Sequence, residues 1–197
     1  MEQISTKILQ FQHISAATKE ATEYIKKRKN HEVKSLKTRW NKFNAACMGG
    51  IEPNTVYTIV GISGSGKSSF VNTLENDLID LNSDQDVIVL NFSFEMLSSR
   101  QVGRKLSSKL RLTTAELYSA NNDLDNESLA KVEETSQQIK SYPIYYVDTP
   151  GTVEDIASTI DYFYENKAKG KKFIVILDHT LLVEGQSRES ALQVISD

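Results

Sequence analysis

The sequence contains one cysteine and no long apolar run. Cys47 has no second cysteine with which to form a disulfide inside the chain, and this fits a reducing compartment. No apolar stretch approaches the ~20 residues that a membrane-spanning helix needs. The opening stretch MEQISTKILQ lacks the apolar segment of a secretion signal. These absences predict a cytoplasmic protein with no membrane partner.

An excess of one charge is also lacking. The formal net charge is −3, so the molecule as a whole does not attract nucleic acid. One local exception is the basic run KKRK, Lys26 to Lys29, which is either a solvent-exposed helix face or a contact for a polyanion. The 197 residues are enough for one α/β domain with attached helix.

Residues 1–35 are expected to form an N-terminal helix and a basic linker. Apolar residues recur there at three- and four-residue steps, which predicts an amphipathic helix. A single helix cannot bury its own apolar stripe, so it must pack on its own domain or on another subunit. The stripe consists of Ile4, Ile8, Phe11, Ile14, Ala17, Ala21 and Ile25.

Residues 36–197 alternate between strand and helix patterns, which predicts an α/β core with a mostly parallel sheet flanked by helices on both faces. One of the intervening helices is expected to begin after Thr152, a plausible N-cap with Asp155 three residues later. The chain ends within another helical pattern, so we expect the core to be incomplete at its C-terminus. The strands are expected at residues 54–60, 86–92, 143–148 and 172–178.

The stretch VGISGSGKSSF predicts a phosphate-binding loop, because Gly61, four residues and then Gly66-Lys67-Ser68 match the P-loop pattern. The glycines let the backbone turn tightly, so that N–H groups at the start of a helix face a phosphate. Lys67 is expected to reach the β- and γ-phosphates, and the Ser68 hydroxyl to bind Mg²⁺. The nucleotide-binding residues would be Gly61, Ser63, Gly64, Ser65, Gly66, Lys67, Ser68 and Ser69.

Acidic residues at strand ends complete the candidate site. A P-loop NTPase needs a carboxylate there to hold Mg²⁺ through water, and both Asp148 and Asp178 follow apolar strands. Glu95 follows the strand at 86–92, which we expect beside the P-loop strand. A carboxylate at that point can orient and deprotonate the attacking water. The alternative is that Glu95 is an exposed residue at the start of the next helix.

The string DTPG, which begins at Asp148, is also typical of the γ-phosphate switch of small GTPases. However, Asp148 lies far beyond Lys67 in the chain, with an extra strand between them. The guanine-reading motif Asn-Lys-x-Asp is lacking, because the closest string, NKAK, has Lys169 where the Asp must accept hydrogen bonds from guanine. The sequence therefore favours an ATPase over a GTPase.

Taken in order, these stretches resemble the C-terminal, RecA-like ATPase domain of DnaB-type replicative DNA helicases. The similarity runs from about Leu36 to Asp197 and stops before the C-terminal part of the family's domain. That family carries an Asp-Thr-Pro-like turn, which accounts for DTPG without a GTPase. The matching stretches are MGGIEPNTVYTIVG, the P-loop, SFEM at Ser93 to Met96, RQVGRKLSSKLRL, PIYYVDTPG and FIVILDHTLLV.

The resemblance implies ATP and Mg²⁺ as cofactors and assigns roles to individual residues. Glu95 and Lys67 would be catalytic, and Asp178 would hold Mg²⁺ through water, together with Ser68 as a direct ligand. His179 replaces the family's usual Tyr, and it either senses the γ-phosphate or packs as a neutral side chain. Ser68 stands where Thr is commoner, but this change removes no catalytic atom.

The resemblance also implies partners. DnaB-type helicases form hexameric rings around single-stranded DNA, and the N-terminal amphipathic helix resembles the linker helix that docks on the adjacent subunit. The family's DNA loop corresponds to VEGQSRES, so Gly185, Gln186 and Arg188 are the candidate DNA contacts. Arg188 fits equally well as a surface residue at a helix start. The cell would be bacterial or phage-infected.

The sequence therefore predicts an ATP-dependent replicative DNA helicase motor that moves on single-stranded DNA, although the 197-residue chain alone is expected to be poorly active. Another RecA-like ATPase, either a recombinase or a clock-type ATPase, stays open. So does a nucleotide-binding assembly module with little turnover.

Overall fold

The computed structural model describes residues 10–121 and 124–178. The chain divides into two compact units, residues 1–35 and residues 36–197, each with its own internal contacts. Within the described ranges, no helix is both long enough and apolar enough to cross a bilayer.

In its described part, the first unit forms one helix, α1 (Ile14–Lys29). The ring of His13 accepts a hydrogen bond from a backbone N–H of the first turn and so caps the helix. The basic run Lys26 to Lys29 occupies the last turn, where positive charge interacts favourably with the helix dipole. Ile14 and Ile25 of the apolar stripe are exposed. A helix is thus present from residue 14 onward, whereas residues 10–13, which include Phe11 of the predicted stripe, are not helical.

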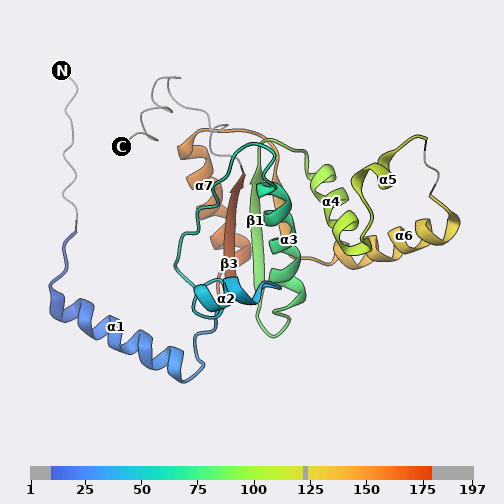
Figure 1. Ribbon diagram of the computed structural model, residues 1–197. Helices are drawn as coiled ribbons and strands as arrows, with labels where there is room; N and C mark the ends of the chain where they lie inside the picture. The colour runs from blue at the N-terminus through green and yellow to red at the C-terminus, as the bar shows by residue number, and fades with distance from the viewer. Residues whose placement is uncertain (1–9, 122–123, 179–197) are drawn as a thin grey trace, which may run out of the picture. The chain divides into compact units, whose positions relative to one another are not determined.

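A parallel sheet forms the centre of the second unit (Figure 1). Its described strands are β1 (Val87–Ser93), β2 (Ile144–Val147) and β3 (Lys172–Asp178), in the order β2-β1-β3. Both neighbours of β1 run parallel to it. Three of the four predicted strands are therefore confirmed, and their carboxyl ends meet at one edge of the sheet.

The strand predicted at residues 54–60 is wrong. These residues run as irregular chain, and Val56 and Val60 are 91% and 87% exposed. The expectation that β1 lies beside a P-loop strand is wrong as well, because β2 and β3 occupy its two edges. A β-branched run favours an extended backbone, but contacts far apart in sequence decide whether it pairs. Among the described residues, no strand pairs with the other edge of β3.

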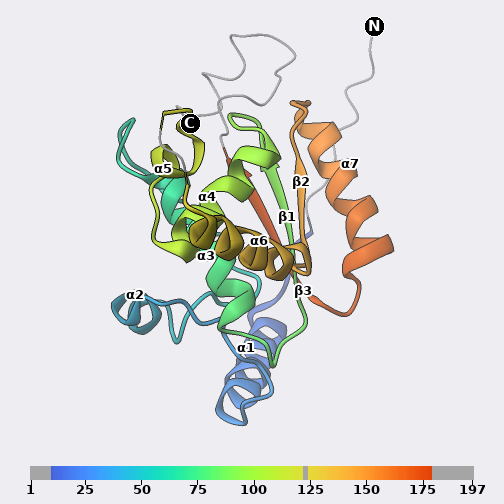
Figure 2. The same cartoon turned by 90° about the vertical axis from the view of Figure 1, so that its right-hand side faces the viewer.

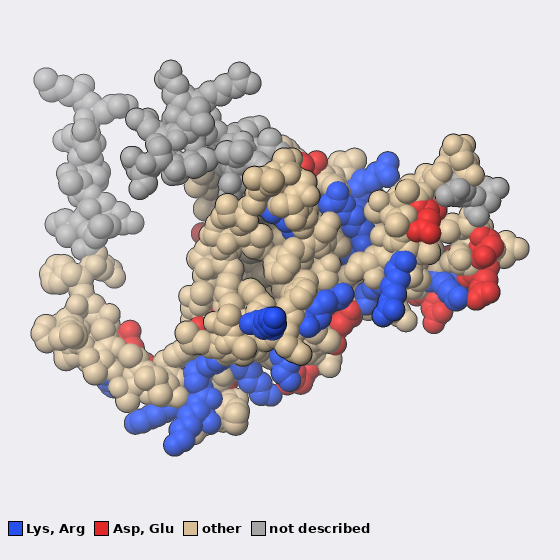
Figure 3. Space-filling model, in the orientation of Figure 1, with Lys and Arg blue, Asp and Glu red and all other residues tan. Residues whose placement is uncertain are grey.

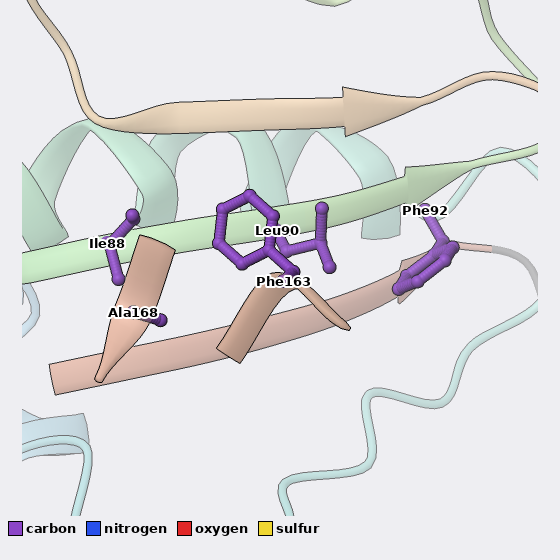
Figure 4. Close-up of a cluster of buried hydrophobic side chains, with 5 residues drawn as sticks. All are labelled: Ile88, Leu90, Phe92, Phe163 and Ala168. Carbon is purple, nitrogen blue, oxygen red and sulfur yellow. The ribbon is translucent and has the colours of Figure 1, made fainter. Parts of the chain in front are cut away.

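One face of the sheet packs against helix α7 (Val153–Phe163) and the π-helical turn η1 (Tyr164–Ala168) that extends it. Alternate residues of β1 point to this side, as the period of two in a strand requires. Figure 4 shows these side chains against Phe163 and Ala168. The buried cluster consists of Ile88, Leu90, Phe92, Phe163 and Ala168.

Helix α7 begins with the predicted N-cap. The Thr152 hydroxyl accepts from the backbone N–H of Asp155 (3.2 Å), and the Asp155 carboxylate accepts from the backbone N–H of Thr152 (3.0 Å). These two bonds form a capping box. The donors of Thr152 hold the pKa of the Asp155 carboxyl below its usual value.

The opposite face of the sheet is covered by α3 (Lys67–Asp80) (Figure 2). Val87 and Val89 of β1 pack there against Leu78 of α3. Helix α4 (Ser98–Leu110) lies beside α3, and α6 (Asn126–Lys140) lies beside α4. Helices on both faces of a parallel sheet are the predicted α/β architecture.

Two short helices complete the described part of this unit. Helix α5 (Thr114–Tyr118) lies between α4 and α6 in the chain, and α2 (Asn41–Ala46), which precedes the P-loop, was not predicted. After α2, Gly50 adopts a φ of +133° at the point where Leu36 and Ile51 form an antiparallel bridge. A Cβ at Gly50 would lie 2.0 Å from the Leu36 carbonyl oxygen, so only glycine fits.

Candidate nucleotide-binding site

The P-loop glycines form an open turn that leads directly into α3. Gly64 and Gly66 have φ values of +78° and +89°, in the left-handed region that favours glycine. Gly66 is the N-cap of α3, and apart from the adjacent residues no atom lies within 4 Å of the position of a Cβ at either glycine. The backbone of the loop can therefore be approached closely, and the amino end of the helix faces it.

Gly61 meets a tighter constraint at the other end of the loop. A Cβ at Gly61 would lie 2.5 Å from the Ser65 hydroxyl oxygen. The backbone N–H of Ser65 also donates to the carbonyl of Ile62 (3.2 Å), which closes the turn. The geometry of the loop therefore favours glycine at position 61, as the P-loop pattern predicts.

The Lys67 ammonium points back over the loop. Its Nζ donates to the carbonyl oxygens of Gly61 (2.8 Å) and Ile62 (3.0 Å). Ser68 follows in the first turn of α3 and is half-buried, whereas Ser63, Ser65 and Ser69 are exposed. A cation, a hydroxyl and backbone N–H groups at a helix start are the donor set that a triphosphate with Mg²⁺ requires.

The backbone positions of Glu95 and Asp178 lie near each other, at the carboxyl ends of the neighbouring strands β1 and β3. Ser93 is the register partner of Asp178, and the backbone N–H of Phe94 donates to the Asp178 carbonyl (3.0 Å). Glu95 is the next residue and is exposed. In Figures 1 and 2, the amino end of α3 lies at this same end of the sheet.

Asp148 has a different position. It follows β2, on the side of β1 opposite to β3. Its carboxylate accepts from the backbone N–H of Ser98 (3.0 Å), at the amino end of α4. A negative charge there is favourable for the helix dipole. Asp148 therefore stabilises α4, which distinguishes it from Asp178.

A buried polar cluster lies behind this site, between α3 and α4. Glu75 and Lys105 form an ion pair, and Glu75 also accepts from the Asn91 amide (2.7 Å) and from the Tyr146 hydroxyl (3.5 Å). Burial lowers the pKa of the Lys105 ammonium, although Glu75 opposes the shift. Burial and the neighbouring Glu75 raise the pKa of Tyr146. The two helices are thus joined through charged groups in the protein interior.

The sequence model of one protein family, the DnaB-like helicase C-terminal domain, matches residues 35–197 of the chain. The chain belongs to this family. Its parallel sheet with helices on both faces is the RecA-like fold of DnaB-like helicase C-terminal domains. No curated protein matches the chain.

Two solved structures have a fold similar to this DnaB-like domain. One is an ATPase domain, with a TM-score of 0.71 and 19% identity over 95% of this chain. The other is a DnaB-like replicative helicase whose interactions with primase were described, with the same TM-score, identity and coverage of this chain. The present chain spans 65% of the first structure and 44% of the second.

Several predicted residues of the DnaB-like domain lie outside the described residues. These are His179 and the candidate DNA contacts Gly185, Gln186 and Arg188. Figure 3 shows positive side chains over α4, negative ones over α5 and side chains of both signs over α6. Within the described ranges, no group of three or more His, Cys, Asp or Glu residues could hold a metal ion.

The polar residues buried between α3 and α4 could not be recognised from the sequence. Glu75, Gln101 and Lys105 carry no signal of burial, because polar and charged residues on a helix ordinarily face solvent. The amphipathic pattern of α4 in this DnaB-like domain therefore did not reveal which of its polar residues face α3.

Proposed function

We propose that the chain is the ATPase motor of a DnaB-type replicative DNA helicase, which couples ATP hydrolysis to movement on single-stranded DNA. The observation that carries this proposal is the hydrogen bond between Phe94 and Asp178 at the end of the sheet that the P-loop also reaches. It holds together two strands whose carboxylates, Glu95 and Asp178, have complementary tasks in hydrolysis. The site of action would be the cytoplasm of a bacterial or phage-infected cell.

The P-loop would bind the triphosphate through its backbone N–H groups. The open space at Gly64 and Gly66 supports this role, because a phosphate must approach the backbone closely. Lys67 would exchange its contacts with two loop carbonyls for phosphate oxygens, which are charged and therefore stronger acceptors. Ser68 would ligate Mg²⁺, and Ser63, Ser65 and Ser69 would line the loop.

Glu95 and Asp178 would have separate roles in ATP hydrolysis. Mg²⁺ neutralises charge on the β- and γ-phosphates during transfer. Asp178 would orient the water ligands of that ion from the end of β3. Glu95, which is exposed in the turn that follows β1, would accept a proton from the attacking water.

A ring of subunits would complete the motor. The apolar residues Ile14 and Ile25 of α1 are exposed, which supports docking of this helix on a neighbouring subunit. Single-stranded DNA would run through a hexameric ring and contact Gly185, Gln186 and Arg188. Light scattering of the purified protein tests the ring, and Ile25→Asp is expected to dissociate it.

The test of the motor is ATP hydrolysis by the complete gene product, with and without single-stranded DNA, together with displacement of a strand from forked DNA. Glu95→Gln is expected to lower the rate of hydrolysis about 100-fold or more, because a general base contributes factors of this size. The affinity for ATP, measured with a fluorescent analogue, should change less than about twofold.

The matched control is Glu133→Gln, which removes another exposed carboxylate, from α6. Its rate of hydrolysis should equal that of the wild type. A Glu95→Gln variant that hydrolyses ATP at the wild-type rate would remove Glu95 from its role. Strand exchange without strand displacement would instead indicate a recombinase.

A nucleotide-binding assembly module is the second candidate. The exposed, unpaired segment at residues 54–60 favours it, because this segment leads into the P-loop and lies outside the sheet. Such a module would bind ATP and assemble, but it would show no hydrolysis above the level of the Glu95→Gln variant.

A further inference from the structure

A chain of hydrogen bonds connects the P-loop helix to the turn that carries Glu95. The Asn72 amide of α3 donates to both the backbone carbonyl (3.0 Å) and the side-chain oxygen (3.1 Å) of Gln101 in α4. The Gln101 amide nitrogen donates to the Ser93 hydroxyl (2.9 Å). The Ser93 hydroxyl in turn donates to the carbonyl of Met96 (2.6 Å).

This last bond encloses Glu95. Ser93 and Met96 stand on either side of Phe94 and Glu95, so the bond between them fixes the backbone from which the Glu95 side chain projects. The Phe94 N–H is held separately by the Asp178 carbonyl. The turn therefore has one anchor on β3 and a second, through Gln101, on α3.

The path is shielded from water. Asn72 and Gln101 are each 3% exposed, and Ser93 is 2% exposed. Hydrogen bonds in such surroundings are not exchanged for bonds to water, and the loss of one partner leaves the other unpaired. A buried amide side chain can hold two elements in a fixed relation, because its nitrogen can only donate hydrogen bonds and its oxygen can only accept them.

We propose that Gln101 is a positioning residue, which sets Glu95 relative to the P-loop by bonding Ser93 and Asn72 at the same time. This inference rests on the proposed function, since it concerns the geometry of hydrolysis. Gln101 touches no reacting atom and acts only through the Glu95 turn. Lys67 and Asn72 share one helix, so the path fixes the Glu95 turn in relation to the helix that begins at Lys67.

The test compares Gln101→Met and Ser93→Ala with the wild type in the complete gene product. Methionine keeps the length of the side chain but neither donates to Ser93 nor accepts well from Asn72. We expect the kcat for ATP hydrolysis to fall about 10- to 100-fold, as for small misplacements of catalytic groups. The dissociation constant for an ATP analogue should change less than twofold, because the P-loop is intact.

Two measurements separate positioning from a merely structural role. Asn82→Ala removes a buried amide that bonds Lys37 and Leu78, away from the Glu95 turn. It should lower the melting temperature at least as much as Gln101→Met, yet keep the wild-type kcat. In addition, Gln101→Met should cause no further loss of kcat when it is combined with Glu95→Gln, because Gln101 acts through Glu95.

The inference is overturned if the folded Gln101→Met and Ser93→Ala variants both keep kcat within twofold of the wild type. It is also overturned if Gln101→Met lowers kcat as much in the Glu95→Gln background as in the wild type. If Gln101→Met does not fold, Ser93→Ala alone decides. If Glu95→Gln hydrolyses ATP at the wild-type rate, the proposed role of Glu95 itself is refuted. This result can be distinguished from a failure of the inference about Gln101.

Discussion

The ion pair between Glu75 and Lys105 offers a sharp test of how α3 and α4 are held together. Their side chains are 0% and 1% exposed, respectively, so each charge depends on the other for compensation. We consider Lys105→Met, Glu75→Gln and the double variant. In the wild type, the Asn91 amide donates to the Glu75 carboxylate (2.7 Å). A glutamine at position 75 can still accept this hydrogen bond. The double variant therefore loses both charges with little change in side-chain shape.

The expected magnitudes follow from burial. Removal of one partner from a buried pair leaves an uncompensated charge and costs about 3–5 kcal/mol, whereas replacement of both partners is often neutral or stabilising. Each single variant should therefore lose about 3–5 kcal/mol of unfolding free energy. The double variant should cost far less than the sum, with a coupling energy of about 2 kcal/mol or more.

Urea denaturation followed by circular dichroism measures these free energies. A cost below about 1 kcal/mol for either single variant would contradict the reasoning, since it would mean that water reaches the pair. The reasoning would also be contradicted if the double variant lost as much unfolding free energy as the two single variants together.

Three further predictions concern the scaffold, and urea denaturation tests each of them. Gly50→Ala should cost about 3 kcal/mol or more, because its Cβ would overlap a backbone oxygen, whereas Gly170→Ala, with a φ of +80° and open space, should cost about 1–2 kcal/mol. Phe163→Ala should cost about 3–5 kcal/mol through loss of core packing, and the exposed Tyr162→Ala about 0.5 kcal/mol or less. Asp155→Ala should destabilise α7 at neutral pH. Because the folded-state pKa of Asp155 lies below its usual 3.8, this carboxylate stabilises the fold above that pH, and its contribution disappears as the pH falls through the folded-state value.

Equal costs for the two glycine variants would refute the steric argument at Gly50. A similar loss in Tyr162→Ala and Phe163→Ala would show that α7 does not bury its Phe163 face against the sheet. A stability difference between wild type and Asp155→Ala that persists unchanged at pH 2 would mean that the carboxylate does not act through its charge.

Local patterns in the sequence were sufficient to predict most of the structure of the second unit, residues 36–197. The apolar runs at β1 and β3 and the glycine spacing before Lys67 each follow from backbone preferences of nearby residues. Thr152 and Asp155 marked the start of α7 correctly for the same reason. Features that depend on a few consecutive residues were therefore predictable.

Features that depend on distant residues were not predictable in this way. The segment at residues 54–60 has the composition of a strand, but its pairing depends on which edges of the sheet other strands occupy. The Glu75–Lys105 pair joins residues 30 positions apart. Nothing in either local sequence distinguishes these two residues from solvent-exposed ones. Glu95 and Asp178 became candidates because each follows an apolar strand, but only the order of motifs along the whole chain favoured Asp178 over Asp148.

The most direct measurement is the position of a metal ion in crystals of the protein with a non-hydrolysable ATP analogue and Mn²⁺ in place of Mg²⁺. Anomalous scattering locates Mn²⁺ without ambiguity. We predict an ion bound to the Ser68 hydroxyl, with the Asp178 carboxylate reaching it through water and Glu95 facing the terminal phosphate. An ion held by Asp148, or Glu95 turned away from the phosphate, would contradict the account.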